Sequence, residues 1–143
     1  MAGYFSKLNG RVYEGSYLAN ADIENGTFAT VNASGKVVAS AANTDVEMIV
    51  MEKLDMWGLN ALRLRFLTED GTVFFVEGDF NPAEYGEYDE TAFTVKANHY
   101  VKMRTPHISD EVILAVDDTL FAALDVGDVC NIAANGKIAK KSS

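Results

Sequence analysis

The amino-acid sequence predicts an all-β protein: a small β-barrel or sandwich of about eight short strands, with one short helix and an extended N-terminal arm. Three observations lead to this fold class. Two segments about 100 residues apart repeat one hairpin-like pattern, several other stretches alternate apolar and polar residues, and helical spacing occurs in one short stretch.

The repeated pattern reads GTFATVNASGKVVA over residues 26–39 and GDVCNIAANGKIAK over residues 127–140. Each copy opens with glycine, alternates apolar and polar residues, breaks at Ser-Gly or Asn-Gly, and resumes with lysine and a β-branched residue. Such period-two strands around a glycine turn are typical of β-hairpins. We therefore expect related hairpins at 26–40 and 127–140, adjacent or pseudo-symmetric, with Gly35 and Gly136 at positive φ.

Other strands follow from alternation alone. They are expected over residues 46–51, 62–67, 72–77, 92–97, 99–104 and 112–116. In the clearest of them, Leu62, Leu64 and Phe66 face one way, and a following Glu-Asp-Gly turn predicts a third hairpin. The polar interval 78–90, which contains a proline and glycines, predicts a surface loop.

The one helix is expected over residues 117–124. An aspartate can cap its first turn, and Leu120, Phe121 and Leu124 follow at helical spacing. Asp125 then begins the exit toward the second hairpin.

Residues 1–20 show neither a helical nor a strand period. They combine three glycines with the apolar residues Tyr4, Phe5, Val12, Tyr13 and Tyr17, and glycines make a helix costly. We interpret this segment as an extended arm that carries aromatic anchors, followed by a single β domain over 21–143. An ordinary first strand packed on its own domain is the alternative.

Composition narrows the classes of function. A chain of 143 residues suits one domain with a substantial core. The net charge of −9 disfavours nucleic-acid binding, because an acidic protein repels phosphate backbones. No stretch approaches the roughly 20 apolar residues of a membrane span, and the start lacks a basic region followed by an apolar run. We expect synthesis and folding in a reducing cytoplasm.

Catalytic and metal-binding patterns are missing from the sequence. His99 and His107 are eight residues apart, which is not a metal-ligand spacing. The acidic loop 79–90 lacks the register of an EF-hand. Cys130, the only cysteine, aligns with Ala29 of the other copy and is expected to be a small buried strand residue. We expect no catalytic residue, cofactor or metal.

Aromatic residues on strands could form a base-stacking surface, but without a basic surface they are expected to be core residues. This expectation covers Phe66, Phe74, Phe75, Phe93 and Tyr100.

One family shares the arrangement of these segments. A Gly-Thr-Phe-Ala-Thr-Val strand, an Asn-Ala-Ser-Gly-Lys turn and a Val-Val-Ala-Ser return follow the glycine-rich arm, and Leu-Phe-Ala-Ala-Leu-Asp-Val-Gly-Asp-Val leads into the closing hairpin. In these features the chain resembles the capsid decoration proteins of tailed bacteriophages, also called auxiliary or cement head proteins. The resemblance covers residues 1–40 and 111–140.

The resemblance implies a non-enzymatic virion protein on the exterior of the capsid, made in the host cytoplasm, which binds and stabilises the capsid lattice. It implies that the arm pairs with the major capsid protein and that the chain self-associates, often as a homotrimer. The implied capsid contacts are Tyr4, Phe5, Val12, Tyr13 and Tyr17. Two alternatives remain: a head-fibre or tail structural protein, and a small β-barrel ligand-binding module or enzyme.

Overall fold

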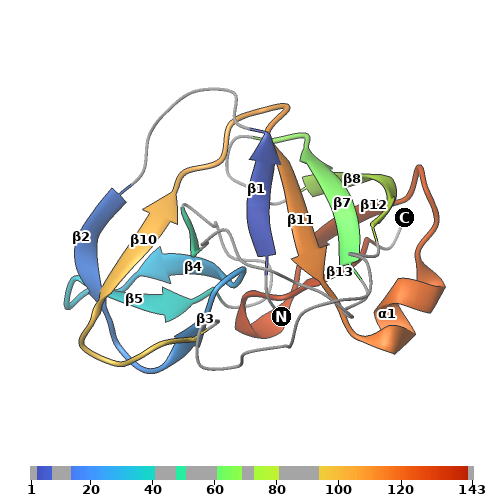
Figure 1. Ribbon diagram of the computed structural model, residues 1–143. Coiled ribbons are helices and arrows are strands. Elements are labelled where there is room, and N and C mark those ends of the chain that lie inside the picture. The colour runs from blue at the N-terminus through green and yellow to red at the C-terminus, as the bar shows by residue number, and fades with distance from the viewer. Residues whose placement is uncertain are drawn as a thin grey trace.

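The computed structural model describes residues 3–7, 14–40, 48–50, 61–68, 73–80 and 94–141 (Figure 1). Within these residues the chain is mainly β, as the sequence predicts, with a closed barrel, a six-stranded sheet and a small two-stranded sheet. Helix α1, Asp118–Ala123, lies at the margin of the six-stranded sheet, far from the barrel.

Five strands close the barrel in the order β10-β2-β5-β4-β6. Neighbours pair antiparallel, except that β2 and β5 run parallel. Their bounds are β2 Glu14–Ala19, β4 Phe28–Val31, β5 Lys36–Ala39, β6 Met48–Val50 and β10 Tyr100–Arg104. Closure leaves this sheet without an unpaired edge.

The second sheet is open, in the order β1-β11-β7-β8-β12-β13, and each neighbouring pair is antiparallel. Its strands are β1 Gly3–Lys7, β7 Ala61–Phe66, β8 Val73–Phe80, β11 Glu111–Ala115, β12 Val129–Ile132 and β13 Ile138–Lys140. The third sheet pairs β3, Ile23–Glu24, with β9, Thr94–Val95.

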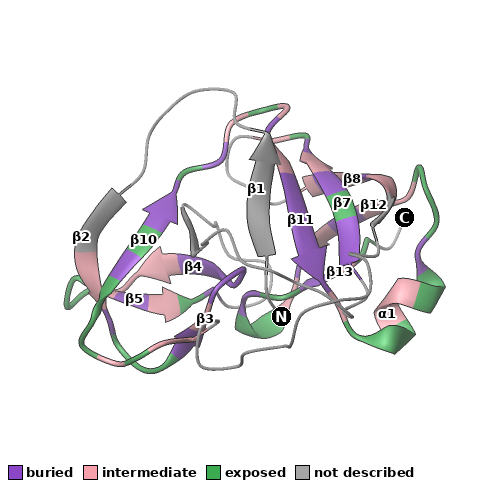
Figure 2. Cartoon of the chain, in the orientation of Figure 1, coloured by how far each residue is buried: buried purple, intermediate pink, exposed green. Residues whose placement is uncertain are grey.

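Two apolar cores lie beneath these sheets. The larger one contains Leu62, Leu64 and Phe66, all fully buried, so the predicted alternation of that strand is confirmed (Figure 2). The smaller core fills the barrel with residues such as Ala19, Val37, Val101 and Met103. Burial of these apolar side chains is the main favourable contribution to the free energy of folding.

Phe28 joins the barrel to the larger core. It belongs to strand β4 of the barrel, yet its ring lies 5.0 Å from that of Phe74 and 6.4 Å from that of Phe66. Phe66 and Phe74 are themselves 4.8 Å apart, and all three side chains are fully buried. Tilted and edge-on aromatic pairs stabilise beyond the area they bury, so this cluster couples the two sheets.

The two predicted hairpins are present and share one register. Ala29 pairs with Ala39 in β4–β5, and Cys130 pairs with Lys140 in β12–β13, which are equivalent positions of the repeat. The predicted positive φ angles are confirmed at 77° for Gly35 and 70° for Gly136. The opening glycines, Gly26 and Gly127, have positive φ angles as well.

The turns of the two hairpins differ in how their amides are satisfied. In the first, the side-chain oxygen of Asn32 accepts from Ser34 N at 2.9 Å and Lys36 N at 3.0 Å. The second has Ala133 at that position, and its side chain has no oxygen to accept from these amides. Its turn, the short helix η1 Ala134–Gly136, instead donates Gly136 N to the carbonyl of Ser40 at 2.9 Å. The tip of the second hairpin therefore packs on the first, and the two copies are adjacent, as expected.

A buried ion pair holds the connection between the barrel and the open sheet. Arg104 ends β10, and its Nε and Nη2 lie 3.1 and 3.0 Å from Oδ2 of Asp110, which also accepts from His107 N at 2.9 Å. Both charged side chains are fully buried. The carbonyl of Asp110 then accepts from Phe66 N at 2.9 Å, so the loop is tied directly to β7.

The expected helix is confirmed at α1, where Asp117 Oδ1 accepts from Leu120 N at 2.7 Å and caps the first turn. The count of about eight strands is low, because the described residues contain thirteen. Three of the additional strands, β1 to β3, lie within residues 3–24, where glycines interrupt any sustained alternation. Strand β8 also extends to Phe80, into the interval predicted as loop.

The described parts of the N-terminal segment are paired with the rest of the chain and do not form a separate arm. Strand β1 pairs with β11, and strand β2 pairs with both β5 and β10 and is required to close the barrel. The expected boundary at residue 20 therefore falls next to a barrel strand, and the alternative interpretation describes residues 14–19 better. Residues 8–13 lie outside the described part of the chain.

Candidate functional site

The outer strands of the open sheet are the candidate site for a protein partner. Strands β1 and β13 each pair with one neighbour among the described residues, β11 and β12 respectively. The outward side of such a strand presents backbone N–H and C=O groups that can pair with another chain. The closed barrel offers no equivalent edge.

The two outer strands differ in charge. Strand β13 ends with Lys140, and exposed Lys137 and Lys141 flank it. Lys140 Nζ lies 3.4 Å from Oδ2 of Asp128. Lysines on an edge strand are a common device against unwanted strand pairing, so β13 is protected.

Strand β1 lacks this protection over most of its length. It reads Gly-Tyr-Phe-Ser-Lys, so its charged residue comes last. Gly3, Tyr4 and Phe5 pair regularly with Leu114, Ile113 and Val112, and the register shifts before Lys7. A shift of this kind restricts the regular edge to the first three residues. Of the two outer strands of the open sheet in the described residues, β1 at Gly3–Phe5 is therefore the better suited to strand addition.

The structure places the predicted contact residues in three settings. Tyr4 and Phe5 lie on β1, at the outer position of the sheet. Val12 and Tyr13 fall outside the described residues. Tyr17 lies on β2, partly buried and packed against the barrel core, so it contributes to packing within its own chain.

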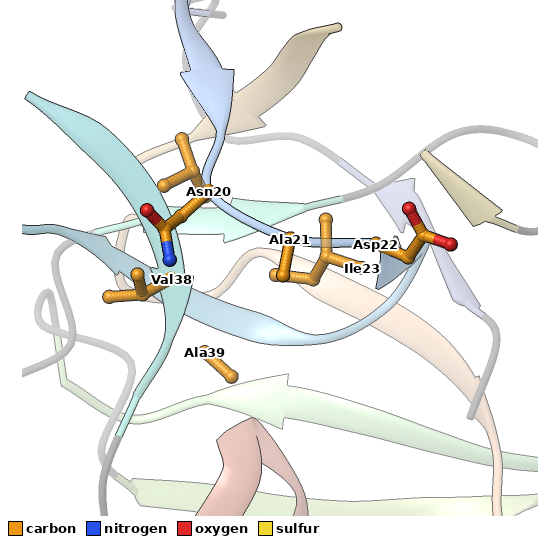
Figure 3. Close-up of a pocket in the computed structure, with 7 residues that line it drawn as sticks. Asn20, Ala21, Asp22, Ile23, Val38 and Ala39 are labelled. Atoms are coloured by element: carbon orange, nitrogen blue, oxygen red, sulfur yellow. The ribbon is translucent and has the colours of Figure 1, made fainter. Parts of the chain in front are cut away.

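One shallow pocket opens beside the barrel, and Figure 3 shows its lining. We call it the Val38 pocket; its volume is about 150 Å³, and its walls are Asn20, Ala21, Asp22, Ile23, Val37, Val38 and Ala39. The Asp22 carboxylate points away from Val38 and Ala39 (Figure 3). Pockets for drug-sized ligands usually measure roughly 300–1,000 Å³, so the Val38 pocket suits a single aliphatic side chain.

Asp22 at this pocket is held in place by the loop after β9. Its Oδ1 accepts from Ala97 N at 2.9 Å, and its Oδ2 lies 3.4 Å from Nζ of Lys96. The backbone hydrogen bond, followed by the lysine, lowers the pKa of Asp22 below its ordinary value of 3.8. The carboxylate is therefore ionised and already engaged at neutral pH.

The chemistry of Cys130 is that of a structural residue. Its thiol is fully buried in the larger core, at the position equivalent to buried Ala29, as the sequence predicts. Burial, with a further contribution from Asp128, raises the pKa of the thiol to about 11. Nucleophilic cysteines instead have lowered pKa values and partial exposure.

Within the described residues, no three His, Cys, Asp or Glu side chains converge to form a candidate metal site. The acidic loop predicted over 79–90 lies almost entirely outside them. None of the helices described there is long and apolar enough to cross a membrane.

Sequence reasoning missed one prominent surface residue. Tyr100 was expected in the core, but 70% of it is exposed on β10, whereas Phe66 and Phe74 are buried as predicted. Phe75 is partly buried beside the guanidinium of Arg65, at 5.3 Å, and Phe93 lies outside the described residues. The signal was present in the alternation of β10, in which Val101 and Met103 take the inward positions.

No known protein family, curated protein or solved structure matches this chain.

Proposed function

We propose that this protein is a non-enzymatic structural protein that binds the outer surface of a phage capsid lattice and stabilises it. The observation that carries the proposal is the weakly protected edge of β1, which lies in the segment for which the resemblance implies capsid contact. The resemblance of the flanking segments to capsid decoration proteins gives the class of partner, the major capsid protein. The net charge of −9 is consistent with a position away from packaged DNA.

The mechanism is strand addition combined with avidity. A capsid strand that pairs with Gly3–Phe5 would continue the six-stranded sheet and gain direction from backbone hydrogen bonds. Several such contacts across neighbouring subunits raise the total affinity without any strong single contact, because each later contact forms at high effective concentration. A homotrimer would supply several contacts at once.

Two alternatives compete with this function. A head-fibre or tail protein would use the same edge on another virion part. A ligand-binding module or enzyme would need a deeper site than the Val38 pocket, which is small and open and is lined mainly by apolar residues. The buried, high-pKa thiol of Cys130 gives no support to an enzyme of the cysteine-nucleophile class.

The test is cosedimentation of the purified protein with expanded phage heads. Deletion of residues 2–7 removes β1 and should abolish retention on heads while the barrel strands remain. A longer deletion through residue 18 would remove most of β2 and open the barrel, so it cannot separate binding from folding.

Two controls accompany this deletion. Lys140→Glu with Lys141→Glu alters the opposite edge and should leave retention unchanged. Circular dichroism and melting should show that the deleted protein is folded. Retention of the folded deletion variant at the wild-type level would contradict the role of β1, and no retention of the intact protein on heads would contradict the proposed function.

A further inference from the structure

A row of three side chains crosses the outer surface of the barrel. Tyr100 of β10 pairs with Leu18 of β2, and Leu18 pairs with Lys36 of β5. Directly paired residues project from the same side of a sheet. Their chain neighbours Val101, Ala19 and Val37 are all buried in the barrel core, so this row points outward.

The exposure of this row is concentrated at Tyr100. Its relative exposure of 70% is the highest among the large apolar residues of the described chain. A tyrosine presents a large rigid surface with a polar end, and such residues are enriched at the centres of protein interfaces. An exposed tyrosine on a regular strand is thus a candidate anchor for a partner.

The row continues directly into the Val38 pocket. Val38 lies two residues beyond Lys36 on β5 and so projects from the same side of that strand, and Asn20 comes directly after the end of β2. Both line the pocket, together with Ala21, Ile23 and Ala39. Figure 3 shows the Asn20 amide beside Val38. The anchor, the pocket and an amide able to bond a peptide backbone therefore form one continuous surface.

Lysines gather around this surface although the chain as a whole is strongly acidic. Lys36, Lys96 and Lys102 all belong to the barrel or to the loop beside it, while the net charge of the chain is −9. Lys36 Nζ donates to the neutral amide oxygen of Asn98 at 3.1 Å, a contact that does not itself neutralise the charge of the lysine. Lys96 pairs with Asp22 at 3.4 Å, where both side chains are largely exposed.

We propose that this surface, the Tyr100 face, is a second docking site that binds an extended acidic segment of a partner protein. The Tyr100 face comprises Leu18, Lys36, Tyr100, Lys102 and the Val38 pocket. One aliphatic side chain of the segment fills the pocket, Tyr100 packs over the adjoining backbone, and a flanking carboxylate faces Lys36.

Charge complementarity decides between the possible occupants. A basic segment would be repelled by Lys36. A nucleic acid extends beyond the small area where the lysines lie and would there meet the net negative charge of the chain. An acidic segment gains from the lysines locally and is limited to the small area where they lie. The pocket of about 150 Å³ adds a requirement for one aliphatic group between the carboxylates.

The probe is the synthetic peptide Ac-Glu-Asp-Leu-Glu-Asp-amide, titrated into the ¹⁵N-labelled full chain and followed by two-dimensional NMR. The amides of residues 18–22, 36–39 and 96–102 should shift, with an affinity that weakens as salt is raised. Replacing the peptide's leucine by alanine, or its acids by lysines, should weaken binding roughly tenfold or more. Absence of shifts, or shifts located elsewhere, would overturn the proposal.

Variants of the protein provide the second measurement. Tyr100→Ala should weaken the peptide roughly tenfold, and Lys36→Glu roughly three- to tenfold. The duplicated hairpin supplies a matched control. Lys137 occupies the position equivalent to Lys36 in the other copy, is exposed, and lies directly before β13. Lys137→Glu makes the same charge change and should leave the affinity within twofold, whereas equal losses in both lysine variants would reveal an unspecific charge effect.

Binding of an acidic segment at the Tyr100 face does not depend on capsid binding. The peptide titration uses the purified chain alone, so its result stands whether or not the protein is retained on phage heads. Retention on heads without peptide binding would reject docking at the Tyr100 face and support the proposed function. Peptide binding without retention on heads would support docking at the Tyr100 face and reject the proposed function.

Discussion

Replacing Gly136 by alanine should destabilise the protein far more than the same change at Gly35. Both glycines have left-handed backbones, with φ angles of 70° and 77°, and occupy equivalent positions of the duplicated hairpin. An added Cβ at Gly35 would meet no described atom within 4 Å. At Gly136 it would overlap the carbonyl oxygen of Phe28 and lie 2.6 Å from Cγ2 of Thr27.

The magnitudes follow from separate contributions. A left-handed alanine costs about 1–2 kcal/mol, partly offset by about 0.4–1 kcal/mol from a less flexible unfolded chain. Gly35→Ala should therefore lower the free energy of unfolding by about 1 kcal/mol. Gly136→Ala adds overpacking of about 1–3 kcal/mol and loss of the Gly136–Ser40 hydrogen bond, worth about 1 kcal/mol. Its total should be about 4 kcal/mol.

Guanidinium denaturation of both variants measures this difference directly, with tryptophan fluorescence and circular dichroism as probes. Equal losses in the two variants would show that the hairpin tip does not pack on β4 in solution, and the account of how the two copies meet would then be wrong. A large loss confined to Gly136→Ala would support it. Wild-type m-values in both variants would show that the unfolded state is unchanged.

Three further predictions concern single side chains. Asn32→Ala should cost about 1 kcal/mol of unfolding free energy, and Asn32→Asp less, because aspartate keeps the acceptor for the turn amides. Asp110→Asn should cost about 3 kcal/mol, since it removes the carboxylate charge that pairs with the buried guanidinium of Arg104; the exposed Asp22→Asn should change denaturation little. Cys130 should resist iodoacetamide at neutral pH unless the chain is unfolded. Because folding raises the pKa of this thiol, the thiol's contribution to the free energy of unfolding should be complete below pH 9.0 and should be lost as the pH rises toward about 11. Cys130→Ala should not show this loss.

The sequence predicts well wherever alternation or glycine placement decides the local structure. Leu62, Leu64 and Phe66 are buried as expected, and Gly35 and Gly136 adopt the expected left-handed backbone. These features depend on neighbours within a few residues, so a single sequence contains the information. The short helix follows from its Asp117 cap for the same reason.

Long-range pairing could not be predicted in the same way. Strand β1 finds its partner β11 more than a hundred residues away, and β2 finds β10 across most of the chain. Tyr100 was misassigned because an aromatic strand residue can face either side, and the choice depends on which register β10 adopts against β2. The Val38 pocket likewise forms only where segments 20–23 and 37–39 meet.

The candidate sites follow from the differences between the two copies of the hairpin, more than from what they share. Phe28 and Val129 are equivalent positions, but Phe28 reaches the larger core, so the first copy joins the sheets while the second copy forms the sheet margin. Because the first copy is closed within the barrel, its outward residues can form a broad face around Lys36. The second copy ends the open sheet with lysines, so that β1 is the outer strand of this sheet that is better able to accept a partner strand among the described residues. The differences between the two copies therefore explain why the face around Lys36 and the edge of β1 are candidates for binding, whereas the lysine-flanked edge of β13 is not.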